Sequence, residues 1–144
     1  MIEDHLFHGT SYEKIISIAE DGYLEALEFE EEDIFPSLQS EKTVYGKDKG
    51  VWVTESRSCV ENYSWGGGYL VIDASDLKVV SDRERPYSVI PSEVGLENIS
   101  EIRLEENQLT SRDYLLEIGS ILESKGHPDI HLKEYQGPEY LIAD

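Results

Sequence analysis

Apolar residues near the N-terminus are spaced first as in a strand and then as in a helix. Residues 6–8 form a short apolar segment that predicts a strand. Thr10, with Glu13 three residues further on, matches a capping box and predicts the start of a helix, which Gly22 is expected to end. The predicted apolar side of that helix consists of Tyr12, Ile15, Ile16 and Ala19.

The middle of the chain predicts two more strands around a short helix. Residues 50–54 and 69–72 are rich in β-branched and aromatic side chains, and the second segment lacks polar alternation, as in a buried strand. Ser56 is expected to cap the helix between them, which carries Tyr63 near its end. Residues 66–68, all glycine, lack the pattern of a phosphate-binding loop and are expected to break this helix as a flexible turn.

The last third of the chain mixes strands with one longer helix. Its predicted strands are residues 87–90, 99–104, 130–132 and 139–142. Either Thr110 or Ser111 is expected to cap the helix, and Gly126 is expected to end it. Because the helices do not alternate regularly with the strands, the pattern favours an α+β fold, and we expect residues 1–144 to form one domain.

The length and charge of the chain limit the functional classes to which it can belong. The chain has 144 residues, 31 Asp plus Glu against 12 Lys plus Arg, and a formal net charge of −19. Such an acidic surface repels phosphate backbones and disfavours direct binding to nucleic acid, whereas it suits a basic protein partner. No apolar run reaches the roughly 20 residues of a membrane span, and the acidic N-terminus differs from a secretory signal, so we expect a cytoplasmic protein without membrane contact. The densest acidic stretch, residues 25–33, is expected to be a solvated surface segment.

The four histidines and the one cysteine do not match a known metal or nucleophile motif. His5 and His8 are expected on opposite faces of the first strand, because side chains alternate there. His127 and His131 flank a proline and are not expected on one helical face. Acidic neighbours oppose a thiolate at Cys59, which we interpret as a small, half-buried side chain. We therefore expect neither a bound metal nor a cysteine nucleophile.

Three segments together resemble one enzyme family. Residues 6–10, Leu-Phe-His-Gly-Thr, followed by a helix, are similar to the opening of ADP-ribosyltransferases of the diphtheria-toxin and poly(ADP-ribose) polymerase type. Residues 50–63 are similar to that family's second block, in which a strand precedes a serine-rich helix with an Asn-Tyr ending. Residues 139–144, Glu-Tyr-Leu-Ile-Ala-Asp, resemble the strand that carries the family's catalytic glutamate. The three blocks span most of the chain in the family's order.

The resemblance implies an α+β fold of split antiparallel β-sheets with short flanking helices, which holds NAD as a substrate in a cleft. It implies that His8 binds the adenosine-side ribose and that the Gly9 backbone binds the nicotinamide carboxamide, with Thr10 beside them. It also implies that Tyr63 stacks on the nicotinamide ring. Glu139 is expected to hydrogen-bond the nicotinamide-side ribose and to stabilise the cation that forms as the glycosidic bond breaks. His8, Tyr63 and Glu139 are thus the expected catalytic residues.

The sequence departs from the family's pattern at several positions. Trp52 stands where the family has its triad tyrosine, so it can stack but offers no hydroxyl. Val60 takes the place of the helix serine that usually binds the carboxamide, while Ser56 lies nearby but out of register. We expect Trp52 and Ser56 to contribute to NAD binding in these altered places. Gly137 replaces the Gln or Glu that is typical of arginine-modifying members, so modification of arginine is not supported.

Two other carboxylates compete with Glu139 for the catalytic role. Glu134 lies just before the turn that precedes the predicted last strand. Glu93 follows Tyr63 by only 30 residues, which leaves little room for the intervening strands, and we rank it last.

The leading hypothesis is a mono-ADP-ribosyltransferase that modifies a protein target, basic or nucleic-acid-binding in view of the charge. In size the chain resembles small bacterial toxins and phage-encoded effectors, including anti-CRISPR transferases, and the host cytoplasm is then its place of action. The alternatives are an NAD glycohydrolase and a catalytically degenerate acidic protein that mimics nucleic acid. An RNA phosphotransferase of related fold needs several basic residues around its phosphate. It is disfavoured because the arginines are scattered along the sequence, at Arg57, Arg83, Arg85, Arg103 and Arg112.

Overall fold

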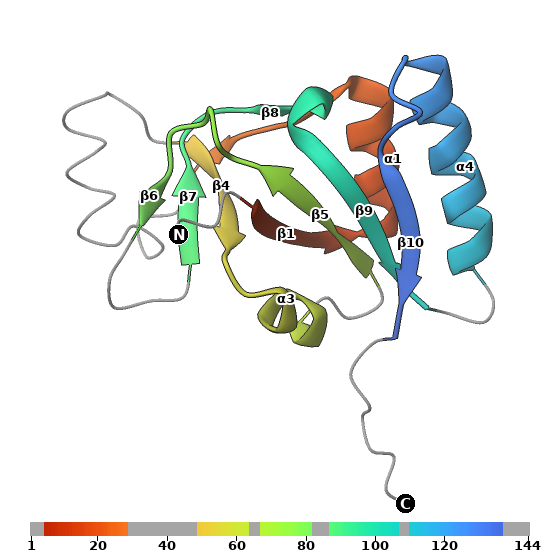
Figure 1. Cartoon of the computed structure of the whole chain (residues 1–144), viewed down its shortest axis with the longest axis horizontal. Helices are drawn as coiled ribbons and strands as arrows, with labels where there is room; N and C mark the ends of the chain where they lie inside the picture. The colour runs from red at the N-terminus through yellow and green to blue at the C-terminus, as the bar shows by residue number, and fades with distance from the viewer. Residues whose placement is uncertain (1–4, 29–48, 64–66, 82–86, 107–109, 137–144) are drawn as a thin grey trace, which may run out of the picture.

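The computed structural model describes residues 5–28, 49–63, 67–81, 87–106 and 110–136 (Figure 1). The described helices are α1 (Tyr12–Asp21), α3 (Arg57–Tyr63) and α4 (Ser111–Ser124), with a short 3-10 helix, η2 (Leu96–Asn98). The long strands are β1 (His5–Ser11), β4 (Lys49–Thr54), β5 (Gly67–Asp73), β7 (Tyr87–Ile90), β9 (Ile99–Glu105) and β10 (His131–Tyr135). Four two-residue strands complete the set: β2 (Tyr23–Leu24), β3 (Leu27–Glu28), β6 (Val80–Ser81) and β8 (Val94–Gly95).

Most of these strands form one large sheet in the order β10-β9-β5-β1-β4-β7-β6, with β3 added beside β4. The strand β10 runs parallel to β9, and the other described pairs in this sheet are antiparallel. The strands β2 and β8 pair separately. A sheet with mostly antiparallel neighbours and irregularly placed helices is an α+β fold, which confirms the predicted class.

The central strand β1 pairs with its two neighbours over very different lengths. It pairs with β5 along its whole length, from His5 opposite Asp73 to Ser11 opposite Gly67. Toward β4 it pairs at a single position, Phe7 opposite Thr54. Beyond Phe7 the two strands diverge, so the second half of β1 has a regular partner on one side only. This divergence creates the space in which the candidate site lies.

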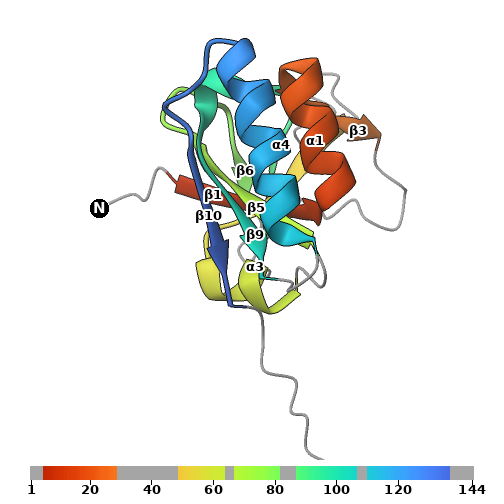
Figure 2. The same cartoon turned by 90° about the vertical axis from the view of Figure 1, so that its right-hand side faces the viewer.

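The main core lies between the sheet and the helices α1 and α4, which pack side by side on one face (Figure 2). Its fully buried members include Ile15 and Ala19 of α1, Ile118 of α4, and Leu70 and Ile72 of β5. The helix α3 covers the opposite face, where a smaller cluster forms around Phe7, Val60, Tyr69, Val71 and Tyr135. Alternation along β1 and β5 explains the two clusters, since neighbouring residues point to opposite faces.

The start of α1 differs from the prediction by one residue. Ser11, rather than Thr10, is the N-cap, and its Oγ accepts a hydrogen bond from the Lys14 N–H at 3.2 Å. Thr10 stays in β1, because the ladder with β5 extends through Ser11. The predicted end of the helix is confirmed: Gly22 adopts φ 88°, a left-handed conformation that suits glycine.

The predicted flexible turn at residues 66–68 is wrong for its last two glycines. Gly67 and Gly68 are buried and begin β5, opposite Ser11 and Thr10. A side chain on Gly68 would overlap the carbonyl oxygen of Arg103 on β9. The glycines therefore allow three strands to lie close together, which a sequence pattern does not distinguish from a loop.

No described helix is both long and apolar enough to cross a membrane.

Candidate functional site

A cavity of about 270 Å³ lies where β1 and β4 diverge. Its lining comes from both strands, from the first turn of α1, and from the end of β2 with the residue that follows it. The lining residues are His8, Gly9, Thr10, Lys14, Leu24, Glu25, Gly50, Val51 and Trp52. Its volume is close to the lower end, roughly 300 Å³, of small-molecule sites in proteins. It is large enough to enclose part of a dinucleotide.

One hydrogen bond bridges the diverging strands. Nδ1 of His8 lies 2.7 Å from the carbonyl oxygen of Trp52. A carbonyl oxygen only accepts, so Nδ1 carries the proton in this bond, and on a neutral ring Nε2 is then an acceptor. Burial lowers the pKa of His8, the Trp52 carbonyl opposes this effect, and the positive charge of Lys14 adds to it. His8 is therefore a neutral imidazole at pH 7, with Nε2 able to accept a hydrogen bond from a hydroxyl group.

The lowered pKa of His8 predicts a pH dependence of stability. The unfolded chain, with an ordinary histidine pKa near 6.5, binds a proton more readily than the folded chain does. The free energy of unfolding is therefore expected to fall as the pH decreases from about 6.5 through the folded pKa of His8. Urea unfolding of the wild type and of His8→Gln at several pH values measures this, and the variant should show a flatter profile over that window. His131→Gln, at an exposed position of β10, is the control. Equal pH profiles for His8→Gln and the wild type would contradict a lowered pKa of His8 in the folded chain.

The cavity brings together four of the residues predicted to bind NAD. His8, Gly9 and Thr10 come from the second half of β1, and Trp52 comes from β4 more than forty positions later in the sequence. The contact that joins Trp52 to this site is made by its carbonyl oxygen, which bonds to His8.

The remaining predicted residues lie elsewhere or outside the described structure. Ser56 is outside the cavity lining and directly precedes α3, where its Oγ accepts a hydrogen bond from the Cys59 N–H at 3.1 Å, as expected for a helix cap. Tyr63 is the last residue of α3, and its side chain is outside the described part of the chain. Glu139 lies outside the described residues altogether.

Neither alternative carboxylate lines this cavity. Glu134 lies on β10, separated from β1 by β9 and β5, and accepts a hydrogen bond from Ser111 Oγ at 2.6 Å. Glu93 is exposed in the turn between β7 and β8. The carboxylate that does line the cavity is Glu25, and Lys14 is the cationic side chain in the same lining; the sequence pattern indicated neither.

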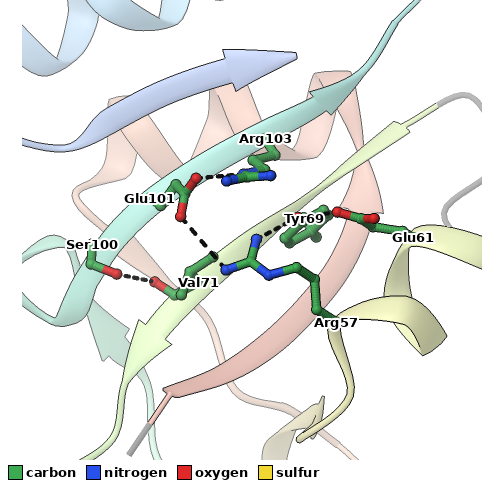
Figure 3. Close-up of polar contacts among 7 residues, drawn as sticks. All are labelled: Arg57, Glu61, Tyr69, Val71, Ser100, Glu101 and Arg103. Carbon is green, nitrogen blue, oxygen red and sulfur yellow. Dashed lines mark hydrogen bonds and ion pairs between the residues drawn. The ribbon is translucent and has the colours of Figure 1, made fainter. Parts of the chain in front are cut away.

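A second, wider hollow of about 570 Å³ lies on the sheet face that α3 covers. A polar network connects this helix to the sheet beside it (Figure 3). Arg57 donates to the Tyr69 hydroxyl at 2.8 Å, and that hydroxyl donates to Glu61 Oε2 at 2.5 Å. The Arg57 guanidinium also lies 3.8 Å from Glu101, which Arg103 contacts from the other side.

The network anchors α3 to the sheet without leaving a net charge. Two arginines face two glutamates, and the Arg57 guanidinium stacks over the Phe7 ring at 4.9 Å from its centroid. Burial, reinforced by the hydrogen bond to Glu61, raises the pKa of Tyr69, so its hydroxyl keeps its proton. Because α3 begins just after Ser56 and ends at Tyr63, this anchor fixes the backbone of two predicted site residues.

Removal of the Tyr69 hydroxyl is expected to destabilise the fold. Tyr69→Phe leaves Glu61 and Arg57 without their shared partner, and we expect a loss of about 1–3 kcal/mol in the free energy of unfolding. Tyr114→Phe is the matched control, because its hydroxyl makes one exposed hydrogen bond of 3.3 Å to Glu13 and should cost about 0.5 kcal/mol or less. Equal losses in urea unfolding would show that the Tyr69 network has no special role.

Among the described residues, no three His, Cys, Asp or Glu side chains are grouped so as to hold a metal ion. No protein-family model matches the chain, and no curated protein is significantly similar to it. The case for a function therefore depends on the cavity and on the sequence resemblance.

Proposed function

We propose that the protein is an NAD-dependent mono-ADP-ribosyltransferase, which breaks the nicotinamide–ribose bond of NAD and transfers ADP-ribose to a protein target. The observation that carries the proposal is the convergence of His8, Gly9, Thr10 and Trp52 on one cavity. The resemblance to ADP-ribosyltransferases assigned these same residues to NAD. The finer fold proposal, split antiparallel sheets around a nucleotide cleft, rests on that resemblance, because the described β1 and β4 belong to one sheet and pair at a single position.

The proposed chemistry uses groups that this chain offers. The Nε2 atom of His8 accepts a ribose hydroxyl. Tyr63, at the end of α3, stacks on the nicotinamide ring, and Trp52 is the second aromatic residue for it. Glu139 supplies the negative charge that stabilises the ribosyl cation while the glycosidic bond breaks. A nucleophile of the target then bonds to the ribose carbon, and neutral nicotinamide and a proton leave.

The target is proposed to be a basic or nucleic-acid-binding protein. The formal charge of −19 attracts such a surface and accelerates encounter at low salt. In this proposal the chain is a small phage or bacterial effector that acts in the host cytoplasm.

Product analysis tests the proposal. Purified protein incubated with NAD is expected to release free nicotinamide. With a basic target protein present, label from the adenine half of NAD should become covalently attached to that target. Release of free ADP-ribose with no labelled protein would instead identify an NAD glycohydrolase, and absence of free nicotinamide would contradict both activities.

Two observations favour a second candidate, an acidic binding protein that mimics nucleic acid. Trp52 stands where the family has a tyrosine hydroxyl, and the net charge is −19. Such a mimic should bind its basic partner with an affinity that falls steeply with salt and does not change with NAD. A salt titration with and without NAD separates the two candidates.

A further inference from the structure

We infer that Lys14 and Glu25 orient the dinucleotide in the cavity, with Lys14 binding its diphosphate and Glu25 facing its cationic nicotinamide ring. This inference rests on the proposed function and adds a specificity-determining charge pair to it.

Lys14 is positioned to receive an anion beside His8. It lies in the first turn of α1, where Ser11 caps the helix and holds the Lys14 backbone. Its side chain is half-buried and lines the cavity, and its charge lowers the pKa of His8. If His8 contacts a ribose, the diphosphate attached to that ribose is the part of NAD that Lys14 can reach.

Glu25 supplies the opposite charge in the same cavity. It follows Leu24, which is buried and pairs with Val94 of β8, so the backbone that carries Glu25 is held in place. Across the described ranges, neither the Lys14 ammonium nor the Glu25 carboxylate belongs to an ion pair with another described residue. The two charges are therefore available to a bound molecule.

NAD has the charge pattern that complements this pair. Its nicotinamide ring is positive and its diphosphate is negative, so a cavity with one cation and one carboxylate can bind it in one direction. A local cation also favours binding of the diphosphate, because a chain of charge −19 otherwise repels that group. Lys14 is half-buried, so its charge interacts with a diphosphate more strongly than a charge in bulk water does, whereas Glu25 is exposed and its charge is more strongly screened.

Calorimetry with four probes separates the two contacts. NAD has both charges, NADH and ADP-ribose have the diphosphate without the positive ring, and nicotinamide riboside has the positive ring without the diphosphate. Lys14→Gln is expected to weaken binding of NAD, NADH and ADP-ribose by about tenfold or more, and to change nicotinamide riboside by less than about twofold. Glu25→Gln is expected to weaken NAD and nicotinamide riboside by about threefold, as for an exposed charge pair, and to spare NADH and ADP-ribose.

Matched controls keep the test specific. Lys125→Gln and Glu123→Gln change exposed charges at the end of α4 and should leave all four affinities unchanged. Lys14→Arg should retain diphosphate binding, and unchanged melting temperatures would show that the variants fold. If Lys14→Gln or Glu25→Gln weakens all four probes equally, or weakens none, the charge pair is wrong while NAD binding stands. If the wild type binds no probe, the proposed function fails and the inference fails with it.

Discussion

Glu139→Gln is expected to reduce the release of nicotinamide from NAD by about 100-fold or more. The substitution keeps the size of the side chain and removes the negative charge that, in the proposed function, stabilises the ribosyl cation. Because it removes no apolar surface, the variant should fold like the wild type. Steady-state assays of free nicotinamide, with circular dichroism as a check of folding, measure the effect.

Two matched variants decide which carboxylate acts. Glu134→Gln changes a residue that bonds to Ser111 far from the cavity, and Glu93→Gln changes an exposed turn residue. Both should retain activity within about threefold if Glu139 is the catalytic acid, since neither carboxylate lines the cavity. Wild-type activity in Glu139→Gln, together with a large loss in either other variant, would move the catalytic role to that residue.

Gly68→Ala is expected to destabilise the fold by about 3 kcal/mol, measured as the free energy of unfolding in urea. The added methyl group overlaps the Arg103 carbonyl oxygen and crowds Leu104 and Ile15, so the backbone of β9 has to move. The strand β5 lies between β1 and β9, so the disturbance reaches the strand that carries His8.

A second glycine provides the control for this substitution. Gly119 lies inside α4, and a Cβ there would lie 3.2 Å from the Leu132 side chain, which can adjust. Gly119→Ala should therefore be neutral or stabilising by up to about 1 kcal/mol, because alanine favours the helix. Equal destabilisation by the two substitutions would contradict the close packing assigned to Gly68.

The longer elements could be predicted because their side chains repeat at a clear period. The apolar run of β5 and the cap at Ser56 both predict structure from local physics, and both are found. The two-residue strands β2, β3, β6 and β8 could not be predicted, since two residues have no measurable alternation. The sequence predicts a turn at Gly67 and Gly68 because the reason for their lack of a side chain is visible only in the fold, where β1 approaches Gly67 and β9 approaches Gly68.

The residues of the candidate site likewise fall into those that local sequence motifs predict and those that only the fold brings to the site. His8, Gly9 and Trp52 could be predicted from local motifs, although only the fold shows that they line one cavity. Glu25 belongs to an acidic run for which the sequence predicts a solvated surface segment, and Glu25 is exposed; its place in the cavity lining depends on the turn at Gly22. The pattern of apolar and polar positions along α1 does not single out Lys14 as a site residue.

The arginines show the same dependence on the fold. Along the sequence they are scattered, whereas in the folded chain Arg57 and Arg103 meet at Glu101 (Figure 3). Pairing of this kind depends on strand order and register, which a single sequence does not specify. Each of these two arginines contacts a carboxylate, so their meeting creates a neutral network.

Calorimetric titration of NAD into the wild-type protein and His8→Ala tests most directly whether the cavity between β1 and β4 binds NAD. The account predicts saturable binding to the wild type, and an affinity at least about tenfold lower for His8→Ala because a hydrogen-bond acceptor for the ribose is lost. Exposed His131→Ala should bind like the wild type. No heat from the wild type at millimolar NAD, or equal affinities for the wild type and His8→Ala, would contradict the account.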